Sequence, residues 1–438
     1  MKNMKICIIG AGSSGIVAAK TLKQYQIDFD CYEAGSKIGG NWRYDNDNNM
    51  SSAYRSLHIN TSRKMMEYSD FPMPKNYPHF PHHSQIIDYF DDYVTHFNIL
   101  ENIIFNTKII DVNFTKNRKK YIVKTDKNQT KEYDGVIVAN GHHWNPRFPE
   151  PAFEGVFEGE TLHSHYYRTP EIFENKNVLV VGIGNSAVDI ACEAARLHTG
   201  KVFISTRSGA YILPNYILGK PFDELSKKIP NQLPLWAKRI LLNSSLWLAR
   251  GKQADYGVPK PKRPILSEHP TNSQDLLNLT GRGKVTIKPN IQQLAGKNVV
   301  FDDNTQEKID IIVWCTGYKM TFPFFQNDFF PAQEVENSND LQLYKRVIHP
   351  DYKNLFFLGL VQPLGAIMPL AELQSKWIAQ LLTQKTALPS EEFMWLDIEK
   401  TQTALKRRYK ESKRHTIQVD FFDYKALLEK ELKQMRAK

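Results

Sequence analysis

The chain has 438 residues with a formal net charge of +10 at pH 7, and 41% of its residues are hydrophobic. That length leaves room for two or three domains, and the composition is that of a globular protein rather than a disordered or fibrous one. No apolar run reaches the roughly 18 residues of a membrane-spanning helix, and the four cysteines stand singly in apolar runs. We therefore expect a cytoplasmic protein with reduced thiols and no metal site. The basic residues are spread along the chain, which favours a solvated surface over a nucleic-acid partner.

The first element is a strand, Ile6–Ile9, that leads into Gly10-Ala11-Gly12-Ser13-Ser14-Gly15 and then into a helical stretch. In this fingerprint the first glycine permits a tight turn and the second lets the backbone approach a pyrophosphate. The third glycine allows close packing of the helix on the strand. The helix N-terminus supplies partial positive charge. Residues 10–15 are therefore predicted to hold a dinucleotide.

The next strand, Phe29–Tyr32, ends at Glu33. A carboxylate at this place can accept hydrogen bonds from a ribose diol, and it would repel a 2′-phosphate. The first nucleotide is therefore expected to be FAD or NAD. A loop-rich stretch, 39–84, follows, and the buried run Gly135–Ala139 is expected to return the chain to the same sheet.

A second strand–turn–helix unit begins at Val178–Val181, after a proline-rich linker, and continues as Gly182-Ile183-Gly184-Asn185-Ser186-Ala187. Alanine replaces the third glycine, which the fingerprint tolerates. The strand after it ends in Ser205-Thr206-Arg207 instead of an acid. A guanidinium can bind a 2′-phosphate bidentately, so this site is expected to take NADP. The alternative for Arg207 is a solvated arginine at a strand end.

Two dinucleotide motifs in one chain imply electron transfer between two bound cofactors. We predict an α/β protein with two Rossmann-like domains, in which the NADP-binding domain (155–304) is inserted into a discontinuous FAD-binding domain (1–150 and 305–438). The stretch 233–248 combines apolar residues with Lys and Arg. A packed helix is favoured there over a helix on a membrane surface. The segment 424–438 is predicted to be a charged amphipathic helix.

Further motifs resemble the flavin-containing monooxygenases over nearly the whole chain. The family fingerprint F-x-G-x-x-x-H-x-x-x-Y is matched by Phe157, Gly159, His163 and Tyr167. Baeyer–Villiger relatives carry tryptophan where Tyr167 stands. The other matching segments are Gly39-Gly40-Asn41-Trp42, Asn60-Thr61-Ser62, Ser69-Asp70-Phe71-Pro72-Met73-Pro74, Cys315-Thr316-Gly317-Tyr318, Gly359–Gly365 and Ala371-Glu372-Leu373-Gln374.

The resemblance implies a soluble, bacterial-type enzyme that uses FAD, NADPH and O2. Its oxygen-transferring species would be a C4a-(hydro)peroxyflavin, and its substrate a tertiary amine, as in N,N-dimethylaniline monooxygenase activity, or a sulfide. Asn60 is the expected catalytic residue, because an amide can donate to the flavin adduct without being an acid that discharges it. A turn asparagine is the structural alternative.

The residues expected to bind cofactors are Gly10, Ala11, Gly12, Ser13, Ser14, Gly15, Glu33, Gly40, Asn41, Trp42, Asn60, Thr61 and Gln362 for FAD, and Gly184, Asn185, Ser186, Ala187, Asp189, Ser205, Thr206 and Arg207 for NADPH. The alternative function is a Baeyer–Villiger or indole-type oxygenase on the same scaffold. A disulfide reductase would need a redox cysteine pair, which the cysteine spacing does not supply. The physiological substrate and the oligomeric state, with a homodimer among the options, stay open.

Overall fold

The structure is a computed structural model that describes residues 4–434 except 116, 118, 198–199, 228, 231–232, 327–328, 331–340 and 409–416. It is a mixed α/β chain built of two compact units. The first unit comprises Met1–Ala53, Leu57–Asn145 and Lys319–Lys438; the second comprises Tyr54–Ser56 and Pro146–Tyr318. The short strands β8 (Asn145–Pro146) and β22 (Tyr318–Lys319) lie where the chain passes from one unit to the other.

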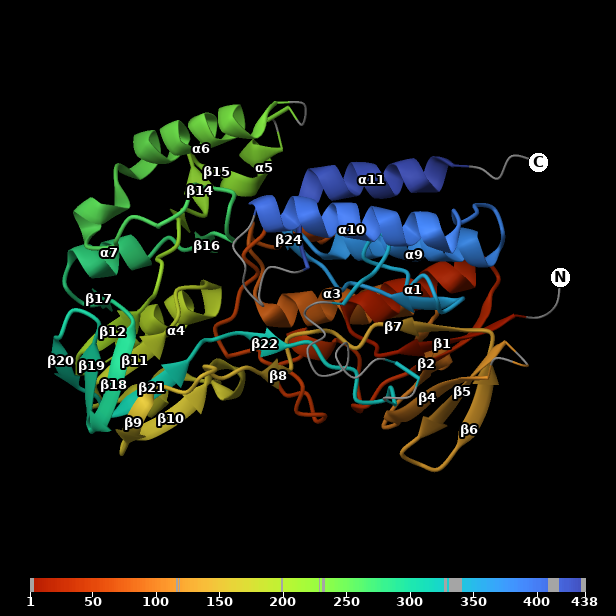
Figure 1. Cartoon of the computed structure of the whole chain (residues 1–438), viewed down its shortest axis with the longest axis horizontal. Coiled ribbons are helices and arrows are strands. Elements are labelled where there is room, and N and C mark those ends of the chain that lie inside the picture. Colours follow the sequence, from red (N-terminus) through yellow and green to blue (C-terminus); the bar gives the residue numbers. More distant parts are fainter. Residues whose placement is uncertain are drawn as a thin grey trace. The chain divides into compact units, whose positions relative to one another are not determined.

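The first unit is built on a five-stranded sheet of order β23-β7-β1-β2-β3, in which every described pairing is parallel. Its strands are β1 (Lys5–Ile9), β2 (Asp28–Tyr32), β3 (Ile103–Ile104), β7 (Gly135–Val138) and β23 (Leu355–Phe357). Strands β1, β2 and β7 of this sheet are labelled in Figure 1. Strands β1, β7 and β23 are short and largely apolar, as is typical of a parallel sheet with both faces covered. β23 joins this sheet from the far end of the sequence, so the first unit is discontinuous in the chain.

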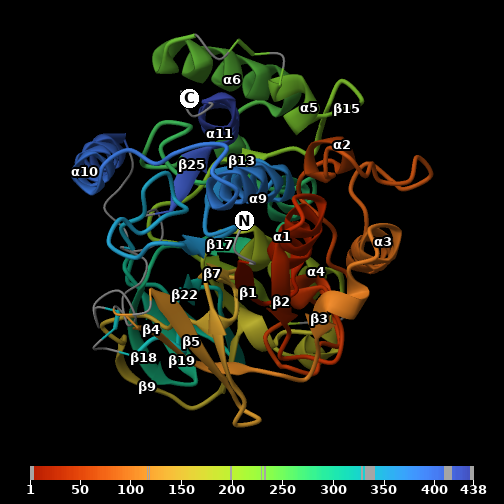
Figure 2. The ribbon, with the colours of Figure 1, turned by 90° about the vertical axis from the view of Figure 1, so that its right-hand side faces the viewer.

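Helix α1 (Ser13–Gln24) packs on α9 (Met368–Leu382), and the two lie side by side in Figures 1 and 2. The other helices of this unit are α2 (Arg63–Met66), α3 (His83–His96), α10 (Glu391–Arg408) and α11 (Phe421–Lys433). The amphipathic helix predicted at 424–438 corresponds to α11, and residues 435–438 lie outside the described part of the chain.

An antiparallel meander of β4 (Ile109–Thr115), β5 (Lys120–Thr125) and β6 (Thr130–Tyr133) is a separate three-stranded sheet of the first unit. Its buried side chains join a core cluster that includes Phe322, Phe325 and Phe357. The remaining short strands here are β24 (Gln362–Leu364) and β25 (Gln418–Asp420), which pair in parallel.

The second unit has its own five-stranded parallel sheet of order β10-β21-β11-β12-β17. Its strands are β10 (Glu160–His163), β11 (Val178–Val181), β12 (Val202–Ser205), β17 (Thr286–Lys288) and β21 (Ile311–Trp314). The sequence prediction ended this domain at 304, whereas β21 pairs with both β10 and β11 and the unit continues to Tyr318. The boundary differs because β21 is buried in the middle of this sheet.

The rest of the second unit comprises a four-stranded sheet of order β20-β19-β18-β9, short strand pairs and helices. Their bounds are β9 (Glu154–Phe157), β13 (Ile212–Leu213), β14 (Tyr216–Ile217), β15 (Lys220–Pro221), β16 (Thr271–Asn272), β18 (Ile291–Gly296), β19 (Asn298–Phe301), β20 (Gln306–Lys308), α4 (Asn185–Arg196), α5 (Phe222–Ser226), α6 (Leu235–Arg250) and α7 (Leu276–Gly281).

Helix α6 covers the segment for which the sequence favoured a packed helix over a membrane-surface helix. It buries Leu242 and Leu246 and exposes five large apolar side chains: Trp236, Ile240, Leu241, Trp247 and Leu248. The packed interpretation therefore holds for one face of the helix. Across the described residues, every helix is too short or too polar to cross a bilayer.

Candidate cofactor sites

The first glycine turn joins β1 to α1 at the carboxyl end of the sheet. Gly10 has a φ of 99°, and a Cβ on it would lie 2.7 Å from the carbonyl oxygen of Ala139. A Cβ on Gly15 would lie 1.8 Å from the carbonyl oxygen of Gly10. Gly10 requires glycine because of its positive φ and its contact with Ala139, and Gly15 requires glycine because the helix starts in direct contact with the turn.

Gly12 is different, because its backbone is extended (φ −73°, ψ −171°) and any residue adopts that conformation. The nearest atom to a Cβ placed on it is the Cα of Gly40, 3.7 Å away. Gly12 is the N-cap of α1, and no side chain of the described residues caps that helix start. An uncapped helix start with room above its glycine fits a pyrophosphate.

Glu33 follows β2 and is buried beside the turn. Its Oε2 accepts a hydrogen bond from the Ala11 N–H at 2.8 Å, and its Oε1 accepts from the Gly35 N–H at 2.8 Å and from Asn48 Nδ2 at 3.0 Å. Burial raises the pKa of Glu33, while these donors oppose that shift. The carboxylate thus fixes the glycine turn and uses three of its roughly four acceptor positions.

The Gly40–Trp42 segment packs on the same turn. The N–H of Gly39 donates to the carbonyl of Ala11 at 3.0 Å. The side-chain oxygen of Asn41 accepts from the N–H and hydroxyl of Ser52, each at 2.8 Å. Trp42 is partly buried against the core. The structure therefore brings this predicted segment beside residues 10–15.

Asn60 lies at an exposed bend just before α2, and Thr61 next to it is buried. The N–H groups of Ile59 and Arg63, on either side, donate to carbonyls of the 79–81 segment at 3.0 and 2.8 Å. The bend is thus held from both sides. This arrangement presents the Asn60 side chain on a backbone that is fixed locally.

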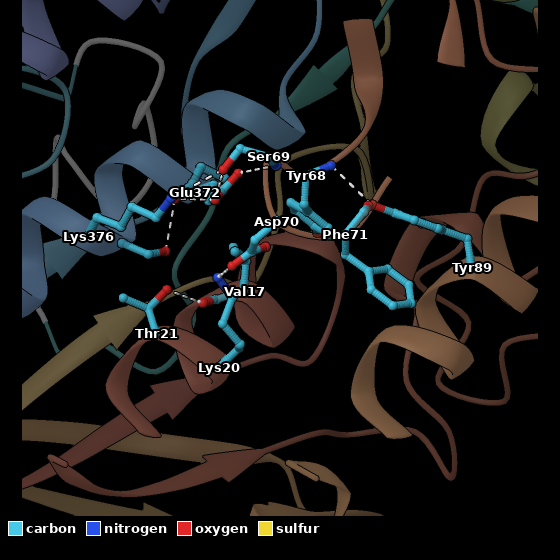
Figure 3. A network of polar contacts seen from close by, with 12 residues as sticks. Val17, Lys20, Thr21, Tyr68, Ser69, Asp70, Phe71, Tyr89, Glu372 and Lys376 are labelled. Carbon is cyan, nitrogen blue, oxygen red and sulfur yellow. Dashed lines mark hydrogen bonds and ion pairs between the residues drawn. The ribbon is translucent and has the colours of Figure 1, made fainter. Parts of the chain in front are cut away.

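An ion pair and hydrogen bonds connect the loop after Asn60 to three helices of the first unit (Figure 3). The buried ammonium of Lys20 on α1 pairs with Asp70 at 2.6 Å. The Tyr89 hydroxyl on α3 donates to the carbonyl of Phe71 at 2.5 Å and accepts from the Tyr68 N–H at 3.0 Å. A lysine is seldom buried unless it is paired, so the Lys20–Asp70 contact ties the loop to α1.

Glu372 on α9 supplies the third attachment (Figure 3). Its carboxylate accepts from the Ser69 N–H at 2.7 Å and the Ser69 hydroxyl at 2.5 Å, and Lys376 pairs with it at 2.6 Å. Burial alone would raise the pKa of Glu372, but the hydrogen bonds from Lys376 and Ser69 hold it below its ordinary value. The carboxylate therefore stays charged and keeps the loop on α9.

The Gly359–Gly365 segment reaches the start of α1 from the far end of the chain. A Cβ on Gly359 would lie 2.1 Å from the Ser14 hydroxyl. The Gly359 N–H donates to the Gln374 side-chain oxygen at 2.9 Å. Gln362 is half-buried on β24, and its N–H donates to the Ile417 carbonyl at 2.9 Å. Tertiary packing thus assembles residues 10–15 with a segment that is distant in sequence.

The second glycine turn repeats this geometry within the second unit. Gly182 has a φ of 128°, and a Cβ on it would lie 2.6 Å from the Cys315 carbonyl oxygen. Gly184 is the N-cap of α4, with φ −78° and ψ 178°. Ala187 is fully buried where the first turn has Gly15. This turn therefore also offers a helix start to a phosphate.

Three predicted residues of α4 have different surroundings. The Asn185 side-chain oxygen accepts from the Asn272 N–H at 2.9 Å. Ser186 is exposed. Asp189 accepts a hydrogen bond from the Tyr54 hydroxyl. Asn185 thus braces the turn against β16, and Asp189 is engaged by another part of this unit.

The residues at the end of β12 that are predicted to bind the 2′-phosphate differ in burial. Ser205 is buried, and its hydroxyl donates to the Pro289 carbonyl at 2.7 Å. Thr206 is half-buried and accepts from the Gly209 N–H at 3.1 Å, whereas Arg207 is exposed. Ser205 therefore serves the fold, and Arg207 is the group that faces solvent.

The two units present different residues at the same register position. Gly10 N–H donates to the Tyr32 carbonyl at 2.8 Å, and Gly182 N–H donates to the Ser205 carbonyl at 2.9 Å. The residue after Tyr32 is the acid Glu33, and the residue after Ser205 is Thr206. A carboxylate is thus replaced by a hydroxyl beside an otherwise equivalent turn.

The fingerprint residues hold the second unit together. A Cβ on Gly159 would lie 2.6 Å from the Asp310 carbonyl oxygen. The His163 ring packs 5.4 Å from Phe148 and 5.5 Å from Tyr318, centroid to centroid. Burial lowers the pKa of His163 to about 4, so its ring is neutral at pH 7. His163 therefore organises the linker residues and is not a proton donor at neutral pH.

A cluster around Asp189 was not anticipated from the sequence. Tyr54–Ser56 belongs to the second unit although Ala53 and Leu57 belong to the first. The Tyr54 hydroxyl donates to Asp189, while the hydroxyls of Ser56 and Tyr167 donate to Glu193. Asp189 and the fingerprint residue Tyr167 were singled out in the sequence, but their partners were not, because these contacts join residues far apart in the chain.

Each of the two units has a parallel sheet and a glycine turn at the start of a helix. This combination is typical of oxidoreductases that use two dinucleotides. The Flavin-binding monooxygenase-like family model matches residues 3–436. "Flavin-containing monooxygenase 5" of Rattus norvegicus is 38% identical over 97% of this chain and 81% of its own length. "Dimethylaniline monooxygenase [N-oxide-forming] 2" of Pan troglodytes is 33% identical over 96% of this chain and 81% of its own length. The solved structure of S-allyl-L-cysteine S-oxygenase from Allium sativum matches with a TM-score of 0.74 and 26% identity, over 99% of this chain and 89% of that one.

The chain belongs to the flavin-binding monooxygenase-like family. It is an NADPH-dependent flavin monooxygenase with FAD as its prosthetic group, acting on a small molecule with O2. The predicted fold class, enzyme class and cofactors are thereby confirmed. The assignment of individual residues to each cofactor remains a prediction.

Substitutions in the glycine turns should separate the two sites. Gly12→Ala should fold, because its methyl has room in the protein, yet lack flavin, because the methyl would enter the space predicted for the pyrophosphate. Gly184→Ala should stay yellow but be reduced poorly by NADPH. Flavin absorbance per protein and anaerobic stopped-flow reduction measure both effects.

Gly15→Ala is the matched control, since its methyl would collide with the backbone and should cost folded protein as well as flavin. The reverse pattern, with flavin lost from Gly184→Ala and kept in Gly12→Ala, would mean that the cofactors are exchanged.

Asp189 should make stability depend on pH. Burial raises its pKa from 3.8 to about 6, so ionisation penalises the folded state and stability is lost as pH rises through that window. The Asp189→Asn side chain cannot ionise. The melting temperature of this variant should therefore exceed that of the wild type by an amount that grows as the pH rises from 3.8 to about 6. Asp255→Asn, at an exposed position of the same unit, is the control. Parallel melting profiles of wild type and Asp189→Asn would contradict this account.

Proposed function

We propose that the enzyme oxygenates a soft nucleophile, the nitrogen of a tertiary amine or the sulfur of a sulfide, through a C4a-(hydro)peroxyflavin. The balance is substrate, NADPH, H+ and O2 giving oxygenated substrate, NADP+ and H2O. An electrophilic oxygen needs only a lone pair held near it, so no substrate-activating acid or nucleophile is required. The relatives named for N-oxide formation and S-oxygenation support this class. Tyr167, where Baeyer–Villiger relatives carry tryptophan, favours it over ketone oxidation.

A substrate panel tests the reaction class. We expect NADPH- and O2-dependent oxygenation of a tertiary amine or a sulfide, with little turnover of cyclohexanone or indole. Product should be identified by mass, and oxygen uptake compared with NADPH oxidation. Turnover confined to the ketone or to indole would replace the proposal by the alternative oxygenase.

In this proposal the first unit holds FAD and the second holds NADPH. The observation that carries the assignment is the exchange of Glu33 for Thr206 at matched positions beside the two turns. Glu33 suits a ribose diol, and its charge would repel a 2′-phosphate. Thr206 removes that charge, and the exposed guanidinium of Arg207 stands next to it.

Arg207→Ala should therefore weaken NADPH binding by roughly 1.5–3 kcal/mol, as for a lost hydrogen bond to a charged group, and leave NADH binding nearly unchanged. Affinities measured by titration of the FAD-loaded enzyme test this. Lys201→Ala, an exposed cation just before the other end of β12, should affect neither nucleotide. Equal losses for NADPH and NADH in Arg207→Ala would remove Arg207 from the phosphate site.

Asn60 is proposed to donate its amide to the oxygenated flavin and to contact NADPH. The support is its place on an exposed bend whose flanking residues are anchored to the 79–81 segment. The loop beyond it is anchored by Lys20, Glu372 and Tyr89. A donor held on a fixed loop is preorganised, which is the condition for electrostatic stabilisation.

Asn60→Leu and Asn60→Asp should keep FAD and accept hydride from NADPH but transfer less oxygen. Loss of one preorganised donor typically costs roughly 10²–10³ in rate, so NADPH oxidation should be diverted to hydrogen peroxide. The ratio of product to NADPH consumed measures this coupling. Asn243→Leu, at an exposed position of α6, is the control. Wild-type coupling in Asn60→Leu would exclude the role.

A further inference from the structure

A cavity of about 470 Å³ lies in the first unit among residues of α10, β25 and α11, together with the segment 343–346. None of the residues predicted to bind FAD or NADPH lines it. Its volume falls within the range typical of small-molecule sites, roughly 300–1,000 Å³. The cavity is therefore distinct from both cofactor sites.

The wall of this cavity contains a buried cation, Arg346, of which 8% is exposed. Its Nη2 has no hydrogen-bond partner among the described residues. Burial lowers the pKa of Arg346, which reflects the cost of its charge in this place, although an arginine stays protonated. A buried polar group without a partner is destabilising, so a ligand carboxylate that reaches the Arg346 guanidinium from the cavity would gain binding energy.

The backbone at this place is unusual. Lys345 and Arg346 have φ values of 49° and 61°, which side-chain-bearing residues rarely adopt. Strained backbone of this kind concentrates at ligand sites, where the surrounding structure holds it. The Tyr424 hydroxyl donates to the Lys345 carbonyl at 2.6 Å and so fixes the segment.

The lining of the cavity contains three cations and three carboxylates, so attraction for a negative charge is local to one cation rather than general. Lys345 is already paired with Asp397 at 2.9 Å. Asp420 and Asp423 also line the wall and disfavour a polyanion such as a phosphate ester. Arg346 is thus the buried cation that remains to be matched.

The rest of the wall is largely apolar, with Leu343, Ile398, Leu405, Val419 and Leu427 among its residues. An apolar wall around one charged group is the usual composition of a site for an amphipathic small molecule. Together these observations define the ligand as an apolar chain that ends in a single carboxylate.

We propose that this cavity binds a monocarboxylate with an apolar tail, whose carboxylate accepts hydrogen bonds from Arg346. The site is connected to the cofactor region through side chains. Tyr424 accepts from Gln374 Nε2 at 2.8 Å, and Gln374 Oε1 accepts from the Gly359 N–H at 2.9 Å. Occupancy of the cavity would therefore act on the Gly359 segment, which packs on α1.

Calorimetric titration of the FAD-loaded enzyme with octanoate, without NADPH, tests the proposal independently of turnover. We expect octanoate to bind with a Kd below about 1 mM. Octan-1-ol and acetate, which lack the charge and the tail respectively, should each bind at least about ten-fold more weakly. Undetectable octanoate binding, or equal binding of octan-1-ol, would overturn the proposal.

Arg346→Gln should weaken octanoate binding by about ten-fold or more, while Arg346→Lys should restore part of it. Lys400→Gln is the matched control: it removes an exposed cation from the cavity rim and should change binding less than about two-fold. Equal losses in Arg346→Gln and Lys400→Gln would indicate unspecific attraction and reject the site.

Leu427→Trp is the second variant, because it fills the cavity without removing a charge. It should retain FAD and lose octanoate binding. Should Arg346→Gln fail to fold, this variant decides the question alone. Wild-type octanoate affinity in Leu427→Trp would place the ligand elsewhere and overturn the proposal.

Discussion

The contact between a helix start and the turn before it is the constraint on which both units depend. In the first unit Gly15 touches the Gly10 carbonyl so closely that no Cβ fits, and in the second Ala187 is fully buried at the matching place. This contact points each helix N-terminus at the carboxyl edge of its parallel sheet. The anion site and the position of the following strand end are consequences of the same packing. Glu33 and Thr206 can be compared directly because the strand, turn and helix start around them have the same arrangement in both units.

The loop between residues 57 and 74 follows a different principle, because buried charges hold it rather than a regular ladder. Lys20 and Glu372 come from helices that lie side by side, and each anchors a different residue of the loop. A buried ion pair costs desolvation, so its presence says more about geometry than about net stability. The bend at Asn60 is held by the 79–81 segment, and the part of the loop at residues 68–71 is held by α1, α3 and α9.

The second unit shows that motif residues also stabilise the architecture around a predicted cofactor site. His163, neutral at pH 7, packs between Phe148 and Tyr318 at the linkers, and Tyr167 donates to Glu193. Ser205 and Asn185, which are predicted to lie at the cofactor, also form side-chain hydrogen bonds with Pro289 and Asn272. The family fingerprint therefore marks the architecture that places a cofactor as well as the residues beside it.

The two glycine turns, the strand ends beside them and the family could all be identified from the sequence alone. Each of these signals lies within a few residues along the chain, where apolar runs and glycines have a direct steric meaning. The folded chain was needed to show that β21 belongs to the second sheet, that Tyr54 donates to Asp189, and that Arg346 lines a cavity. The partners in these cases are far apart in sequence. Which distant groups meet depends on how whole elements pack, and local periodicity carries no record of that.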